Sequence, residues 1–115
     1  MKMIEAIIRQ EKIEPVKNAL EDMGIIGITL TEVSGRGRQK GIALQWRAGE
    51  YRVDLLPKVK IEVVLDDDKA ESAVEAICNA AKTGKEGDGV IFVLPIESAI
   101  RVRTSDTVGF CGAGI

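Results

Sequence analysis

The chain has 115 residues, of which 45% are hydrophobic and 30% are charged, and its net charge is −2. This length and balance predict one globular domain, and the small net charge gives no electrostatic reason to expect nucleic acid as a partner. There is no histidine, which excludes catalytic triads and other acid–base chemistry built on histidine. No apolar run approaches the ~20 residues of a membrane helix and no signal-peptide pattern is present, so we expect a cytoplasmic protein. Because histidine is absent, we do not expect an enzyme.

The first half of the chain has the pattern of a strand, a helix and a strand. Residues 3–9, "MIEAIIR", are short, apolar and β-branched, as in a buried strand. Residues 12–24 carry Pro15 near a helix start, apolar residues at helical spacing, and Gly24 in the usual stop position. Residues 27–35, "GITLTEVSG", alternate as a second strand.

The second half repeats this plan without repeating the sequence. Residues 58–65 alternate as a strand, residues 67–84 form a helix with an acidic first turn, and residues 89–95 and 99–104 are predicted strands. The order predicts an α+β fold, a ferredoxin-like double βαβ sandwich with two helices on a four-stranded antiparallel sheet. The strands "MIEAIIR" and "VIFVLP" are apolar on both faces, which predicts that an oligomer buries the second face.

A long segment between Val33 and Lys58 does not fit this plan. It has no clear periodicity, which is typical of functional loops or disordered segments. Its first part, "GRGRQKG" at 35–41, places glycines among cationic and amide side chains. That composition suits anion binding, and it suits a solvated flexible loop equally well.

Two further segments carry glycine or arginine in patterns that suit phosphate. "TGKEGDG", residues 83–89, lacks the spacing of a Walker A loop, and on its own a simple turn is the better interpretation. Arg101 and Arg103, two residues apart on the predicted strand, would share one face and match phosphate oxygens. Three such signals in one small domain favour a phosphate-bearing ligand.

The two cysteines form no metal-spaced set. Cys78 lies at helical spacing from Val74 and Ile77, which predicts a core residue. Cys111 lies in a glycine-rich apolar tail, where an isolated thiol is more often incidental than redox-active.

Four segments together carry a family resemblance. They are "GRGRQKG" (35–41), "EYRVDLLPKVKIEVV" (50–64), "TGKEGDGVIFV" (83–93) and "IRVRT" (100–104). With these in order, the chain resembles the PII nitrogen-regulatory signal-transduction proteins over nearly its whole length. The resemblance implies a single domain over 1–115 that forms a homotrimer, with a T-loop at about 37–55 and a C-terminal tail at about 105–115. It also implies ATP or ADP bound in clefts between subunits, with Mg²⁺ and 2-oxoglutarate as further ligands.

The resemblance assigns residues to these ligands. The implied nucleotide site comprises Ile7, Thr29, Gly35, Gly37, Arg38, Glu62, Val64, Gly87, Asp88, Gly89, Val90, Arg101 and Arg103. The implied 2-oxoglutarate site comprises Gly37, Gln39, Lys40, Gly41 and Lys58. Gln39 would help to hold Mg²⁺, Lys58 would pair with the distal carboxylate of 2-oxoglutarate, and the two strand arginines would reach the phosphates from the adjoining subunit.

The T-loop of this family docks into partners, often an ammonium transporter of the Amt family. Contact with a membrane would therefore come only through a partner. Tyr51 matches a tyrosine that some bacterial members have uridylylated, which makes it a candidate modification site, although Trp46 in "WRAGEY" replaces the usual tyrosine.

Val90 also departs from the family pattern, because the glycine loop usually ends in a basic residue. This departure keeps an alternative in view, a PII-like nucleotide-binding regulator with a different second ligand and partner, such as one in bicarbonate metabolism. Gln39 and Lys58 argue against that alternative. An enzyme of the same fold, such as an acylphosphatase, is disfavoured because the arginine and asparagine it needs are not evident.

Overall fold

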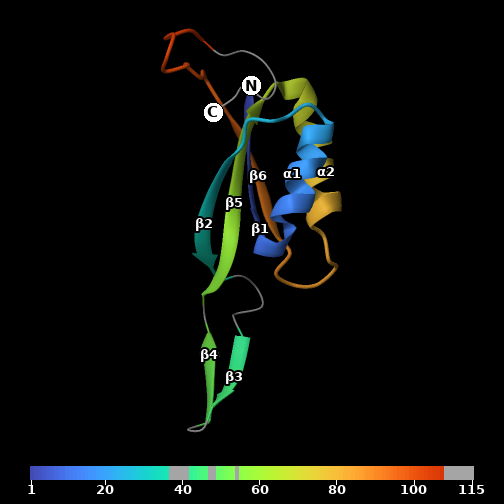
Figure 1. Ribbon diagram of the computed structural model, residues 1–115, viewed down its shortest axis with the longest axis vertical. Coiled ribbons are helices and arrows are strands. Elements are labelled where there is room, and N and C mark those ends of the chain that lie inside the picture. The colour runs from blue at the N-terminus through green and yellow to red at the C-terminus, as the bar shows by residue number, and fades with distance from the viewer. Residues whose placement is uncertain (37–41, 47–48, 54, 108–115) are drawn as a thin grey trace.

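Four strands of this chain form one antiparallel sheet, and two helices lie side by side against one of its faces (Figure 1). The computed structural model describes residues 1–36, 42–46, 49–53 and 55–107, and for 42–46 and 49–53 it describes the course of the backbone. The elements are β1 (Lys2–Ile8), a 3-10 turn (Gln10–Lys12), α1 (Ile13–Asp22), β2 (Thr29–Gly35), β3 (Ile42–Trp46), β4 (Gly49–Val53), β5 (Leu56–Leu65), α2 (Asp67–Ala81) and β6 (Gly89–Pro95).

The strand order is β2-β5-β1-β6, and every neighbouring pair is antiparallel. Each helix connects strands that are not neighbours, α1 between β1 and β2 and α2 between β5 and β6. This is the ferredoxin-like arrangement of two βαβ units, so the predicted fold class is confirmed.

Strict alternation along the central strands builds the core. On β5, the odd-numbered residues from Val59 to Leu65 are buried against the helices, while Lys60, Glu62 and Val64 face the other way and are partly exposed. The helices meet this surface with residues at spacings of three and four. The buried helix residues are Val16, Leu20, Ala70, Ala73, Ile77 and Ala81.

Gly24 ends α1 as the sequence pattern predicts. Its φ of +81° lies in the left-handed region that glycine adopts without a Cβ penalty. The amide of Gly24 donates to the carbonyl of Glu21 at 2.8 Å, and the amide of Ile25 donates to that of Leu20 at 2.9 Å. These two bonds form a Schellman motif, and the buried Ile25 side chain closes it.

The face of the sheet away from the helices is open in the single chain. On β6 it carries Val90, Phe92 and Leu94, whose exposed fractions are 46%, 47% and 38%. In the middle of this face Lys60 forms a salt bridge with Glu5 at 3.4 Å. Burial of this apolar surface by other copies of the chain stays a prediction.

The structure adds to one sequence prediction about regular structure and corrects another. The long segment after Val33 contains a two-stranded hairpin of β3 and β4, with Ile42 opposite Val53. Its β-branched and aromatic residues supply strand propensity, which the surrounding Gly, Arg and Gln residues obscured.

The predicted strand at 99–104 is not formed. A turn occupies residues 102–104, the Ser105 amide bonds the Arg101 carbonyl at 2.7 Å, and one isolated bridge joins Ile100 to Thr107. A strand requires a ladder partner, and among the described residues this segment has none.

Gly89 is where the chain enters β6, and its backbone lies directly against β1. Its φ is +120°, and a Cβ built on it would lie 1.9 Å from the carbonyl oxygen of Ile7. The glycine is therefore required first by the neighbouring strand, before any ligand is considered.

We expect Gly89→Ala to destabilise the fold by about 3 kcal/mol, because the added methyl group meets a strand backbone that cannot move aside. Gly84→Ala is the matched control, since Gly84 also has a positive φ, of +88°, but nothing lies within 4 Å of its added Cβ. That control should cost only about 1 kcal/mol of backbone strain. Urea unfolding of both variants measures the difference, and equal losses would contradict a steric role for Ile7.

Candidate ligand-binding site

Segments far apart in the sequence meet at one end of the sheet and enclose a cavity of about 690 Å³. We call it the glycine-loop cavity. It is lined by Ile7, Gly35, Arg36, Lys58, Lys85, Glu86, Gly87, Asp88, Gly89 and Val90. Its volume falls within the range of small-molecule sites, roughly 300–1,000 Å³. The end of β2, the start of β5 and the loop before β6 each contribute to its wall.

The carboxylate of Asp88 organises the loop between α2 and β6. One of its oxygens accepts the backbone amides of Thr83 at 2.8 Å and Gly84 at 2.9 Å. The other accepts the hydroxyl of Thr83 and lies 3.2 Å from Nε of Arg9. These hydrogen bonds, that of the Thr83 hydroxyl first, hold the pKa of Asp88 well below its ordinary value, although partial desolvation opposes them.

Arg9 connects the same loop to the end of β1. Besides its ion pair with Asp88, its guanidinium donates to the carbonyl of Glu86 at 2.7 Å. One planar side chain therefore fixes two points of the loop, which is the fork geometry that arginine provides. The loop position is set by a residue almost eighty positions away in the sequence.

Lys58 lies at the base of the cavity and is only 8% exposed. Its ammonium group donates to the carbonyl of Gly87 at 2.5 Å. Burial lowers the pKa of Lys58 and the nearby Arg9 cation lowers it further, while the carboxylates of Glu11 and Asp88 act in the opposite direction.

The charges around the cavity favour an anionic ligand. Arg36, Lys58 and Lys85 line it as cations. Of the two acidic residues that line it, Asp88 is already satisfied by Arg9 and the loop amides. Ile7 and Val90 add an apolar wall, which suits a ligand that has a flat apolar part as well as a charged one.

The structure places seven of the sequence-predicted site residues in this one cavity. They are Ile7, Gly35, Lys58, Gly87, Asp88, Gly89 and Val90. Thr29, Glu62 and Val64 lie on the same open face but outside the cavity, with Thr29 directly opposite Glu62. Glu62 is four residues from Lys58 along β5, about 13 Å at the rise of a strand.

Other predicted residues cannot be placed in the same way. Gly37, Arg38, Gln39, Lys40 and Gly41 lie outside the described residues, and so does Cys111. Tyr51 belongs to β4, where the structure describes the backbone alone.

The arginines at 101 and 103 require a correction. They do not share a strand face, because this segment turns. Neither residue lines the glycine-loop cavity of its own chain.

Sequence reasoning missed Arg9, Arg36 and Thr83. Arg9 gave only a weak signal, as the polar residue that follows an apolar strand. Arg36 lies in the "GRGRQKG" segment, where the resemblance assigns a role to Arg38 and none to Arg36. Thr83 begins "TGKEGDG", which on its own predicts a simple turn, and its hydroxyl and amide both donate to Asp88.

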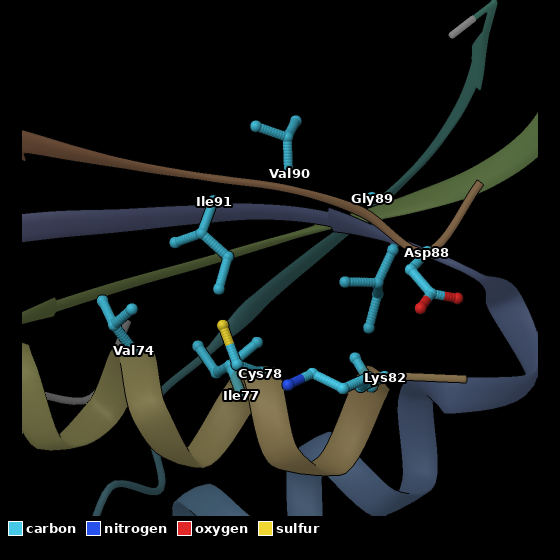
Figure 2. A pocket seen from close by; sticks show the side chains of 10 residues that line it. Val74, Ile77, Cys78, Lys82, Asp88, Gly89, Val90 and Ile91 are labelled. Carbon is cyan, nitrogen blue, oxygen red and sulfur yellow. The ribbon is translucent and has the colours of Figure 1, made fainter. Parts of the chain in front are cut away.

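A smaller cavity of about 420 Å³ lies between α2 and β6, and it corrects the prediction for Cys78 (Figure 2). Cys78 is exposed and lines this cavity, with its sulfur directed toward β6. It follows Ile77, which belongs to the buried stripe, and one helical step of about 100° takes its side chain out of that stripe.

The fold is a ferredoxin-like α+β sandwich with a cavity at one end of its sheet, and comparison with known proteins identifies the family. The family described as "Nitrogen regulatory protein P-II" matches residues 1–106. The chain is 57% identical to the Nitrogen regulatory protein P-II of Rhizobium meliloti (strain 1021) over 107 residues, covering 93% of this chain and 96% of that protein. It is 52% identical to the Nitrogen regulatory protein P-II 2 of Methanothermobacter thermautotrophicus, covering 93% of each.

The chain therefore belongs to the P-II family of nitrogen regulatory proteins and is a regulator, not an enzyme. The resemblance drawn from the four sequence segments is confirmed. Within the described parts of the chain, neither helix is both long and apolar enough to cross a bilayer.

The lowered pKa of Asp88 predicts a pH dependence of stability. A carboxyl group with a lower pKa in the folded chain stabilises the fold fully above its unfolded value of about 3.9, and this stabilisation is lost as the pH falls. We expect Asp88→Asn to be less stable than the parent chain at pH 7, and the difference to narrow between about pH 5 and pH 2.

Chemical denaturation across that pH range measures this difference. Glu97→Gln is the matched control, since it removes one exposed acid that has no described partner. If the difference in unfolding free energy between Asp88→Asn and the parent chain stays constant down to pH 2, the ionised carboxylate of Asp88 does not stabilise the fold.

Proposed function

We propose that this chain is a PII-type signal-transduction protein that binds ATP or ADP in the glycine-loop cavity and regulates nitrogen assimilation. The observation that carries the proposal is the meeting, in one cavity, of seven residues predicted from separate sequence segments. Membership of the P-II family supports the regulatory part of the proposal.

The chemistry of the cavity supports a nucleotide as the ligand. Backbone at Gly87–Gly89 allows close approach, and Lys85 provides positive charge for phosphates. Ile7 and Val90 provide apolar surface beside the charged region. Thr29, Glu62 and Val64 would extend the nucleoside pocket along the open face, and Arg38, Arg101 and Arg103 would add charge at the phosphates, the last two from the adjoining subunit.

We propose 2-oxoglutarate as the second ligand, with Lys58 as its distal carboxylate partner. The ammonium of Lys58 already faces an acceptor, the carbonyl of Gly87, at the cavity base. A ligand carboxylate would replace that neutral acceptor with a charged one, which makes a stronger hydrogen bond. Gln39 with a bound Mg²⁺, and the backbone of Gly37, Lys40 and Gly41, would complete this site.

The segment at about 37–55 would carry the signal to a partner, such as an ammonium transporter of the Amt family. Residues that flank it on both sides line the cavity, Arg36 where β2 ends and Lys58 near the start of β5. A ligand in the cavity would therefore touch both stems of the segment and bias its conformation.

Calorimetric titration tests the ligands directly. We expect ATP and ADP to bind, and 2-oxoglutarate to bind measurably only together with Mg²⁺ and ATP, because the metal would bridge the two ligands. Nucleotide binding that is indifferent to 2-oxoglutarate would favour a regulator with a different second ligand. No binding of either nucleotide at millimolar concentration would contradict the proposal.

Lys58→Met separates the two ligands in the same experiment. It should abolish the effect of 2-oxoglutarate while leaving nucleotide affinity largely intact. Lys69→Met is a matched control, because Lys69 is exposed on α2 and does not line the cavity. An equal loss of affinity for both ligands in Lys58→Met would mean that Lys58 stabilises the loop at Gly87 and does not bind 2-oxoglutarate specifically.

A homotrimer would bury the open face of the sheet. The exposed Val90, Phe92 and Leu94 support this, since a row of half-exposed large apolar residues is typical of an interface. Analytical ultracentrifugation should give the mass of three 12.4 kDa chains. Phe92→Glu should weaken the assembly, because it would bury a charge without a partner. A monomeric profile for the parent chain would refute the trimer.

A further inference from the structure

The wall of the glycine-loop cavity has a neutral position where β6 begins. Val90 lines the cavity, and its side chain points away from α2 toward the open face (Figure 2). Its exposed fraction of 46% leaves it accessible to a ligand. Val90 offers no charge to an anion, so cations for a phosphate chain must come from elsewhere in the wall.

Arg36 is a cation in the same wall that no site assignment includes. It follows Gly35, the last residue of β2, and lines the cavity together with Val90. Its side chain is exposed, and within the described ranges it has no hydrogen-bond or ion-pair partner. Lys58, in contrast, is held by the carbonyl of Gly87.

We propose that Arg36 is a specificity-determining residue that binds the phosphate chain of the nucleotide and supplies the charge that Val90 lacks. This inference rests on the proposed nucleotide site and names a further member of it. A guanidinium suits this task, because its planar fork matches phosphate oxygens in pairs and its charge is permanent.

The position of Arg36 has a consequence for selectivity between nucleotides. A residue that contacts only the phosphates contributes more as the number of phosphates and the negative charge rise. Arg36 should therefore increase the affinity for ATP relative to AMP and adenosine. Because Arg36 directly precedes the 37–55 segment, phosphate binding would also restrain the start of that segment.

Arg36→Gln tests this by titration with ATP, ADP, AMP and adenosine. Glutamine keeps a polar side chain and removes the charge. We expect ATP affinity to fall about tenfold, the loss of one charge-assisted hydrogen bond at an exposed site, with smaller losses for ADP and AMP and no change for adenosine. Arg36→Lys should retain part of the ATP affinity.

Lys69→Gln is the matched control, because Lys69 is exposed on α2 outside the cavity and the substitution changes the net charge equally. It should leave all four affinities unchanged. Adding Val90→Arg to Arg36→Gln should restore most of the ATP affinity, since a cation would then enter the same cavity from β6.

The outcomes are distinct. Unchanged ATP affinity in Arg36→Gln, beside a parent chain that binds ATP, overturns the role of Arg36 and leaves the proposed function standing. An equal loss for ATP and adenosine overturns it as well, since it would indicate a structural effect. A parent chain that binds no adenine nucleotide overturns the proposed function and this inference together.

Discussion

The candidate site depends on the carboxylate of Asp88, which holds the loop between α2 and β6 in one conformation. That loop contains three glycines with positive φ, at 84, 87 and 89, and glycine loses more conformational freedom on ordering than any other residue. Fixing each backbone residue costs about 1–2 kcal/mol. Four donors on one carboxylate offset part of this cost, and the donor from Arg9 connects the loop to the sheet.

The same loop directs two successive carbonyl groups toward protein cations. The carbonyl of Glu86 accepts from Arg9, and that of Gly87 accepts from the buried ammonium of Lys58. Because burial makes the charged form of Lys58 less favourable, an anion in the cavity would relieve that cost while competing with Gly87 for the ammonium. The loop and an effector carboxylate would then share one donor, which connects the two parts of the proposed site physically.

The sequence predicts most of the fold because its signals are local. Alternation along 58–65 gave a strand with one buried face, and Gly24 and the spacing of Val16 and Leu20 gave the helix that the Schellman motif ends. The prediction of a strand at 99–104 was wrong because the presence of a partner strand cannot be deduced from the local sequence. The prediction that Cys78 is a core residue was wrong because its apolar neighbours Val74 and Ile77 do not fix the edge of the buried stripe, and Cys78 lies one helical step beyond Ile77.

The candidate site also contains some residues that the local sequence indicates and others that only the folded structure brings together. The glycines of "TGKEGDG" are visible in the sequence, but on their own they indicate a simple turn, and the family resemblance assigned Gly87 and Gly89 to the site. The ion pair of Arg9 with Asp88 joins residues 79 positions apart, and no pattern within either segment indicates it. Arg36 is a similar case, because its place in the same cavity as Val90 follows only from the pairing of β2 with β5, of β5 with β1 and of β1 with β6.

That pairing also decides how a ligand could act at a distance. Gly35 and Leu56 are the last pair of the β2–β5 ladder before the long segment, so the sheet fixes both ends of it next to the cavity. A ligand that binds both Arg36, next to the end of β2, and Lys58, near the start of β5, would restrain both ends of the segment at once. Since coupling between two sites is reciprocal in free energy, a partner whose binding to the segment responded to the ligand would change ligand affinity by the same factor.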